Sequence, residues 1–173
     1  MATVQVSLAE YLAASYRPDC DYIYGELEER HVGEKEHSAV QAFFVLWLGL
    51  HEKEWKLEAF PELRIQVATD RVRVADIAVL RQDEPYESVL TRPPLAIVEV
   101  LSPEDRISRY QDRLEDYRRM GIPAIWVIDP GHRGAFNCSG GVWVPAEEFR
   151  IRDTDVRIPM TQLWSKLDAL RGR

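Results

Sequence analysis

The apolar residues of this chain change their spacing several times, and each change predicts a different element. Alternation, or a short fully apolar run, indicates a strand, whereas recurrence at about 3.6 residues indicates a helix. A first short helix is expected after Ser7, which has capping-box spacing with Glu10. Further helices are expected at 37–55, 105–120 and 160–170. Strands are expected at 22–32, 57–67, 72–80, 95–101 and 124–128, with weaker signals at 135–138 and 142–144.

The order of these elements predicts an α/β fold in which a mixed sheet is flanked by helices. Asp70 and Arg71 separate two of the strands, so we expect a hairpin turn there. The strand–helix–strand unit from Leu95 to Ile128 predicts a parallel pair joined by a right-handed crossover. No repeat, low-complexity tract or linker interrupts the pattern, and we therefore expect a single domain over residues 1–173.

The longest expected helix, 37–55, is apolar on more than one side. One face at helical spacing consists of Val40, Phe43, Phe44, Trp47 and Leu48. The other side carries Ala39, Ala42, Val45, Leu46 and Leu50. A helix that is apolar nearly all round is buried on several sides. Two interpretations stay open: a central core helix in a monomer, or a helix that also forms the interface of a homodimer.

Composition narrows the class of protein. Hydrophobic residues make up 46% of the chain, enough for a sizeable core, and no run approaches the roughly 18 apolar residues of a membrane helix. The N-terminus lacks the pattern of a signal peptide. Cys20 and Cys138 lie far apart and match no metal-ligand spacing, which is typical of reduced thiols in an intracellular protein. We expect a cytoplasmic protein that does not associate with membranes.

The formal net charge of −7 argues against broad, sequence-independent DNA binding, which depends on Lys and Arg neutralising phosphates. It does not exclude a nuclease. Carboxylates gathered for a divalent metal make such a site acidic, and the metal restores attraction for phosphate. Charge alone leaves the partner open.

Two of the expected strands carry a carboxylate on an otherwise apolar face. Alternation places Asp76 on the face of Val74 and Ala78, and it places Glu99 on the face of Ile97. A buried carboxylate must be paired, hydrogen-bonded or bound to metal, because a bare buried charge costs several kcal/mol or more. Two carboxylates on neighbouring strands repel unless a cation lies between them, and oxygen ligands suit Mg²⁺ and Mn²⁺. The alternative, that each carboxylate caps a loop or pairs with an arginine, stays open.

A wider pattern surrounds this pair. Its most distinctive block is Ile97-Val98-Glu99-Val100-Leu101-Ser102-Pro103. The other matching blocks are Tyr24-Gly25-Glu26-Leu27, His37-Ser38, Arg73-Val74-Ala75-Asp76-Ile77-Ala78-Val79, and Tyr117 and Gly121 followed by Trp126-Val127-Ile128-Asp129-Pro130. In these blocks, over about residues 8–135, the chain resembles the Uma2-type family of restriction endonucleases, within the PD-(D/E)XK nuclease superfamily.

The resemblance implies a restriction-endonuclease-like fold, in which a central mixed β-sheet is flanked by helices. It also implies hydrolysis of DNA phosphodiester bonds with the help of Mg²⁺ or Mn²⁺. Asp76 and Glu99 would hold the ion, and the backbone carbonyl of Val100 would add a ligand. Glu26 or His37 would complete the metal shell or position water. Such an ion lowers the pKa of bound water, polarises a phosphoryl oxygen and offsets charge in the transition state.

Three positions depart from the family's pattern. Ala75 replaces a proline that shapes the backbone and does no chemistry. Leu101 stands where the superfamily has a lysine, and the family's alternative base on the following helix corresponds here to Arg113. An arginine stabilises phosphate charge but stays protonated, so it cannot act as a general base. Deprotonation would then rest on the metal or on solvent.

Three candidate site residues also have simpler structural interpretations. Arg113 lies at helical spacing with Arg109, as a solvated or salt-bridged helix flank would. His37 can be hydrogen-bonded locally at a helix start. Glu26 lies close to other glutamates in an exposed-looking segment.

Three functions stay open. The first is a metal-dependent DNA endonuclease acting as a homodimer, favoured by Asp76 and Glu99. The second is a non-catalytic nucleic-acid-binding or oligomeric module of the same fold, favoured by Leu101, Arg113 and the acidic charge. The third is a metal-dependent phosphohydrolase acting on another substrate. Arginines that fill the pocket around the two carboxylates would indicate a structural role.

Overall fold

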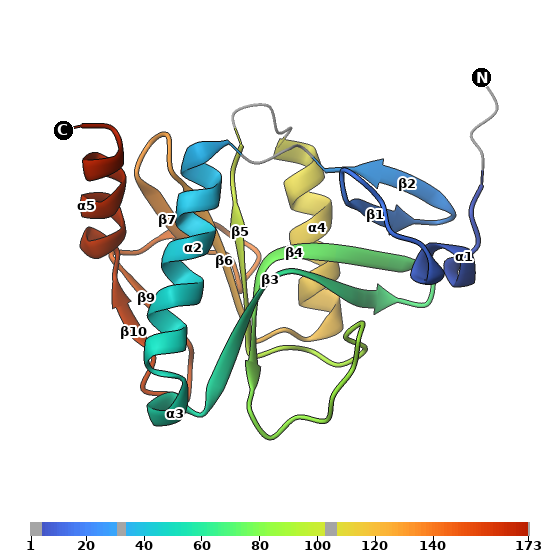
Figure 1. Cartoon of the computed structure of the whole chain (residues 1–173), viewed down its shortest axis with the longest axis horizontal. Helices are drawn as coiled ribbons and strands as arrows, with labels where there is room; N and C mark the ends of the chain where they lie inside the picture. The colour runs from blue at the N-terminus through green and yellow to red at the C-terminus, as the bar shows by residue number, and fades with distance from the viewer. Residues whose placement is uncertain (1–4, 31–33, 103–106, 173) are drawn as a thin grey trace.

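The computed structural model describes residues 5–30, 34–102 and 107–172, which form a mixed sheet with helices around it (Figure 1). The helices are α1 (Leu8–Ala13), α2 (Lys35–Leu50), α3 (Glu52–Trp55), α4 (Ile107–Met120) and α5 (Met160–Leu170). The strands are β1 (Cys20–Ile23), β2 (Glu26–Glu29), β3 (Leu57–Ala68), β4 (Arg71–Arg81), β5 (Ala96–Val100), β6 (Ala124–Asp129), β7 (Gly134–Asn137), β8 (Val144–Pro145), β9 (Glu148–Arg150) and β10 (Arg157–Pro159).

The sheet is mixed, as the order of the elements predicted. Within the described ranges it has eight strands in the order β2-β1-β4-β5-β6-β7-β8, with β3 pairing with β4. β5 and β6 are parallel and α4 lies between them in the chain, whereas the other pairs are antiparallel. The predicted hairpin is β3–β4, and its turn lies at 69–70, one residue earlier than expected. β9 and β10, which the sequence did not predict, form a separate pair.

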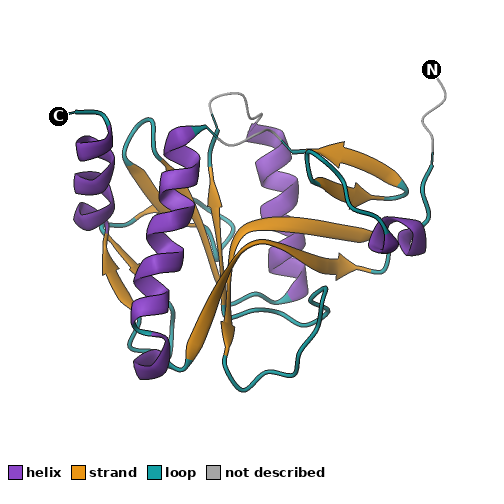
Figure 2. Cartoon of the chain, viewed as in Figure 1, coloured by secondary structure: helices purple, strands orange, loops and turns teal. Residues whose placement is uncertain are grey.

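Helices cover both faces of the central strands (Figure 2). α2 and α5 contribute to one apolar cluster with β4, β5 and β6, and α4 contributes to a second cluster with alternate residues of the same strands. Every residue of β5 is buried as a result. A charged side chain on β5 therefore lies in the interior and needs partners there.

The expected single strand over 22–32 is wrong, because the chain forms the β1–β2 hairpin instead. Tyr24 and Gly25 join the two strands with φ of 51° and 89°. Two consecutive positive φ values are characteristic of the tight turns that match the twist of paired strands. Tyrosine is not a typical residue at such a position, so this turn has only a weak signal in the sequence. Residues 31 and 32 of the expected strand lie outside the described ranges.

The long helix is confirmed over most of its length, but it ends at Leu50 and a separate short turn of helix, α3, follows His51. Leu46 and Leu50 point away from the core, with exposed fractions of 60% and 83%. The expected start of the next helix at Asp105 lies outside the described ranges, and α4 is described from Ile107. In the part of the chain that is described, no helix has the length and apolarity needed to span a membrane.

Candidate active site

Two buried carboxylates lie on neighbouring strands at the centre of the sheet. Ile77 of β4 is paired with Val98 of β5, and the same antiparallel register places Asp76 opposite Glu99. Their exposed fractions are 1% and 0%. The structure therefore brings these two sequence candidates together in the interior, where each needs a compensating charge or hydrogen bonds.

Asp76 is surrounded by donors from three parts of the chain. One carboxylate oxygen accepts a hydrogen bond from the Arg30 guanidinium, and the other accepts one from the backbone N–H of Val100 at 2.7 Å. His37 Nε2, at the start of α2, lies 3.3 Å from the second oxygen. Burial opposes ionisation of Asp76, but Arg30 and His37 outweigh it and hold its pKa well below the usual range. Asp76 is thus an ionised carboxylate neutralised by an arginine.

Glu99 is held from α4. Its Oε2 accepts a hydrogen bond from Arg113 at 2.9 Å, and its Oε1 accepts one from the Tyr117 hydroxyl at 2.6 Å. Burial outweighs the attraction of Arg113 and raises the pKa of Glu99 to about 7. Burial also holds the pKa of Tyr117 well above its ordinary value, so the hydroxyl stays a hydrogen-bond donor.

A third buried carboxylate, Asp21 of β1, shares Arg113 with Glu99. Asp21 Oδ2 accepts hydrogen bonds from Arg113 at 2.8 Å and from Arg73 at 3.1 Å. Arg73 also pairs with Asp116 of α4 at 2.8 Å. This network connects β1, β4 and α4, and it fixes the guanidinium of Arg113 between two carboxylates.

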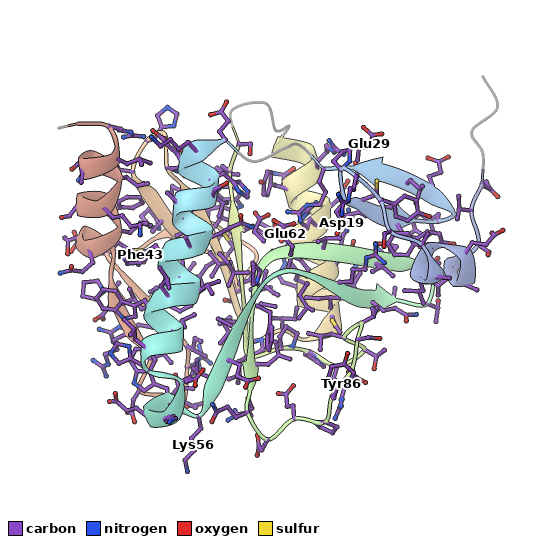
Figure 3. All side chains as sticks on the ribbon, in the orientation of Figure 1. Asp19, Glu29, Phe43, Lys56, Glu62 and Tyr86 are labelled. Atoms are coloured by element: carbon purple, nitrogen blue, oxygen red, sulfur yellow. The ribbon has the colours of Figure 1, made fainter. Side chains whose placement is uncertain are left out.

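A cavity of about 30 Å³ lies beside Asp76. It is lined by Glu29, Arg30, His37, Asp76, Ser102, Arg109, Tyr110 and Arg113. A cavity of this size holds one or two water molecules. Glu99 is not among the described residues of its wall, whereas its partner Arg113 is. Figure 3 shows Glu62 between α2 and α4 and Glu29 at the end of β2, next to the helix that carries Arg109.

Two other residues proposed from the sequence, Val100 and Glu26, lie at different distances from the carboxylate pair. The backbone carbonyl of Val100 follows Glu99 on β5 and accepts a hydrogen bond from the Tyr110 hydroxyl at 2.7 Å. Glu26 begins β2 beside the hairpin turn, and it lines a separate pocket together with Ile23 and Arg73. The structure brings Val100 to the carboxylate pair but does not bring Glu26 to the cavity beside Asp76.

The donor set fits a hard divalent cation in its chemistry, because two carboxylates and a backbone carbonyl supply oxygen ligands. Two guanidinium groups supply the positive charge instead, Arg30 at Asp76 and Arg113 at Glu99. Over the described ranges, no group of three or more His, Cys, Asp or Glu residues is placed to hold an ion. An ion bound by Asp76 would therefore have to displace Arg30.

The sequence left several residues of this site unassigned. Asp21 carries the signal that identified Asp76, a carboxylate within a strand, but the expected strand began one residue later, at Tyr22. Tyr117 matched the family pattern in the sequence but was given no role in the site. Arg30 gave no signal, because its contact with Asp76 spans 46 residues of sequence. Pairing of this kind depends on the tertiary fold.

Comparison with known proteins agrees with this fold. A family model named Uma2 and described as "Putative restriction endonuclease" matches residues 8–150. The chain is similar to a crystal structure described as that of "a putative nuclease belonging to DUF820" from Anabaena variabilis ATCC 29413, with a TM-score of 0.73 and 21% identity over 94% of this chain and 99% of that one. A cryo-electron microscopy structure of a DrdV–DNA complex matches with a TM-score of 0.44 and 16% identity, over 79% of this chain and 11% of that one. No curated protein matches the sequence.

The crystal-structure match confirms the predicted fold, a central mixed sheet with flanking helices. The family match spans the N-terminal hairpin, both carboxylate strands, α4 and β6. It thus contains every residue of the cavity and both residues of the carboxylate pair. The chain belongs to the Uma2 family of restriction-endonuclease-like proteins.

Proposed function

We propose that this protein hydrolyses DNA phosphodiester bonds with the help of Mg²⁺ or Mn²⁺ bound at Asp76 and Glu99. The observation that carries the proposal is the position of these two buried carboxylates, opposite each other on β4 and β5, next to a cavity lined by arginines. Membership of a nuclease family supports it. A carboxylate pair fits a divalent ion, and the charge of such an ion attracts the phosphate of a nucleic acid.

Each residue of the pair has a distinct role in this proposal. Asp76 is ionised and offers its carboxylate without losing a proton, whereas Glu99, with a pKa of about 7, must release one to become a ligand. The carbonyl of Val100 is a third oxygen on the same strand. Asp76, Glu99 and the Val100 carbonyl would hold the ion, which would supply a water of lowered pKa and polarise the phosphoryl oxygen.

In this proposal the remaining side chains orient other groups and do not exchange protons. Arg113 cannot act as a base, since a guanidinium stays protonated; it orients Glu99 and lines the cavity. We assign His37, which also lines the cavity, to holding a water molecule there. Glu26 lies away from the cavity and takes no part in the proposed step.

The proposal is tested by nicking of supercoiled plasmid in Mg²⁺, Mn²⁺ or EDTA. Asp76→Asn keeps an acceptor for the Val100 N–H but loses the charge, so nicking should fall by about a hundredfold or more, as expected when a metal ligand is removed. Glu58→Gln is the matched control, because Glu58 is an exposed carboxylate on β3. Metal-independent nicking, or nicking that Asp76→Asn retains, would overturn the proposal.

One observation favours a second function, a non-catalytic module. All four oxygens of Asp76 and Glu99 accept hydrogen bonds from groups of the chain itself. Arg30 and Arg113 thus occupy the pocket in the way expected for a structural role, and such a centre suits a non-catalytic module in which arginines replace the metal and the network stabilises the fold. Absence of metal binding at millimolar concentration, together with unchanged stability in EDTA, would favour this alternative.

A further inference from the structure

The Arg30 guanidinium places a positive charge of the chain itself beside Asp76. It follows β2, and its backbone N–H donates to the Asp19 carbonyl at 3.1 Å. Its guanidinium reaches across the sheet to Asp76, and only 12% of the side chain is exposed. Burial works against the charge of Arg30, but Asp76 and Glu62 outweigh it and raise the pKa of Arg30. The guanidinium therefore stays charged beside the carboxylate that a metal ion would use.

Glu62 gives Arg30 a second carboxylate close to the surface. The Arg30 Nη1 donates to Glu62 Oε2 at 2.6 Å while Nη2 donates to Asp76. The β3–β4 register pairs Leu63 with Ala75, so Glu62 lies opposite Asp76. Unlike Asp76, the Glu62 side chain is 47% exposed. Arg30 can thus leave Asp76 and keep one charged partner.

Gln41 of α2 holds Glu62 in this place. Its side-chain amide donates to Glu62 Oε1 at 2.5 Å and to the Asp76 backbone carbonyl at 3.1 Å. Glu62 has a positive φ of 52°. This conformation is unfavourable for a residue with a Cβ and persists where surrounding contacts hold it. Gln41 and Arg30 therefore hold the Glu62 carboxylate beside the Arg30 guanidinium.

We infer that Arg30 competes with a divalent metal ion for the Asp76 carboxylate, and that Glu62 holds Arg30 when the ion is bound. A guanidinium and a divalent cation cannot share the same carboxylate oxygens, because like charges repel strongly at short range in a poorly solvated site. The chain thus carries an autoinhibitory contact: the metal site is closed while Arg30 lies on Asp76 and open while Arg30 lies on Glu62 alone. This inference rests on the proposed metal site.

Calorimetric titration of the full chain with Mn²⁺, without DNA, tests the inference. Arg30→Gln should bind Mn²⁺ about tenfold more tightly or better, because it removes the competing charge. Arg109→Gln is the matched control, since Arg109 lines the same cavity but pairs with Glu28; its Mn²⁺ affinity should stay within about threefold of wild type. Arg30→Lys keeps the charge and should also stay close to wild type. Equal gains in all three variants would overturn the inference.

Glu62→Gln tests the inference independently and leaves the buried Arg30–Asp76 pair in place if Arg30→Gln does not fold. It should weaken Mn²⁺ binding about threefold or more, because Arg30 loses its second partner and stays on Asp76. Glu58→Gln removes an exposed carboxylate from the same strand and should have no such effect. In a double variant with Arg30→Gln, Glu62→Gln should lose its effect. An effect of the same size with and without Arg30 would overturn the role of Glu62.

The proposed function is judged separately, by plasmid nicking. Tighter Mn²⁺ binding by Arg30→Gln without nicking by any variant would support the inference and contradict the nuclease proposal. Nicking that depends on Asp76, with identical Mn²⁺ affinity in wild type and Arg30→Gln, would support the proposal and overturn the inference.

Discussion

Asp76 and Glu99 are both buried on neighbouring strands, yet their carboxylates differ in protonation. Asp76 has Arg30 beside it and His37 close by, and its pKa lies well below the usual range. Glu99 depends on Arg113, which also pairs with the buried Asp21. Burial and the negative charge of the neighbouring Asp76 outweigh the attraction of Arg113 and raise the pKa of Glu99 to about 7. Two similar side chains thus have separate chemical properties because of the arginines beside them.

This difference predicts how stability depends on pH in metal-free protein. The folded state holds the Glu99 proton more tightly than the unfolded chain does, so the resulting stabilisation is present below about pH 4.5 and disappears as pH rises through about 7. Glu99→Gln imitates the protonated side chain. The unfolding free energy of wild type relative to Glu99→Gln should fall by about 2 kcal/mol between about pH 5 and about pH 8. Urea unfolding of both proteins in EDTA measures it; a constant or rising difference would show that Glu99 is ionised throughout.

At the scale of elements, the β1–β2 hairpin brings to the site charged residues that the central strands β4 and β5 do not carry. Asp21 lies on β1, and Arg30 directly follows β2. The turn between the strands requires positive φ at both Tyr24 and Gly25. A small turn thus determines whether Asp21 and Arg30 reach the centre of the sheet.

Two glycine substitutions should have opposite effects on stability. Gly25→Ala adds a Cβ that meets its neighbours at ordinary distances, the nearest at 3.6 Å, but φ is 89° there, so the unfolding free energy should fall by about 1 kcal/mol. Gly49 lies exposed in α2, and a Cβ there meets no atom within 4 Å. Gly49→Ala should raise the unfolding free energy by about 0.5–1 kcal/mol. Chemical denaturation of both variants beside wild type measures the changes; equal signs would contradict the assigned conformations.

Strong local patterns made most of the fold predictable. β4, β5 and α4 have long apolar periodicity, and Asp76 and Glu99 interrupt it visibly, so both the strands and the carboxylate pair could be read from the sequence. The turn of the β1–β2 hairpin could not be predicted from the sequence, since Tyr24 is an unusual residue for positive φ. The two short strands β9 and β10 have three residues each, too few for a periodic signal. Arg30 and Gln41 join the site through contacts between distant residues, which no local pattern records.

At the scale of the whole molecule, the acidic charge and the arginine-lined cavity act in opposite directions on a nucleic acid. The net charge of −7 repels DNA at long range. Each arginine of the cavity is paired with a carboxylate of the chain, so these arginines add little free positive charge. Affinity for DNA is therefore expected to come from a bound metal ion rather than from a basic surface. A homodimer that presents two sites stays a prediction, consistent with the exposed Leu46 and Leu50 on α2.

Binding of fluorescent duplex DNA should therefore depend on divalent metal. In EDTA at about 150 mM salt, anisotropy should show no binding at micromolar protein, because few phosphates can be neutralised by Lys and Arg. Ca²⁺, a hard cation that also takes carboxylate and carbonyl oxygens as ligands, should restore binding to wild type but not to Asp76→Asn. The Ca²⁺-dependent affinity should change only weakly with salt, since the logarithm of affinity falls with the number of phosphate contacts. Tight binding in EDTA with a steep salt dependence would place the DNA on a basic surface instead, and it would favour the non-catalytic module over the nuclease.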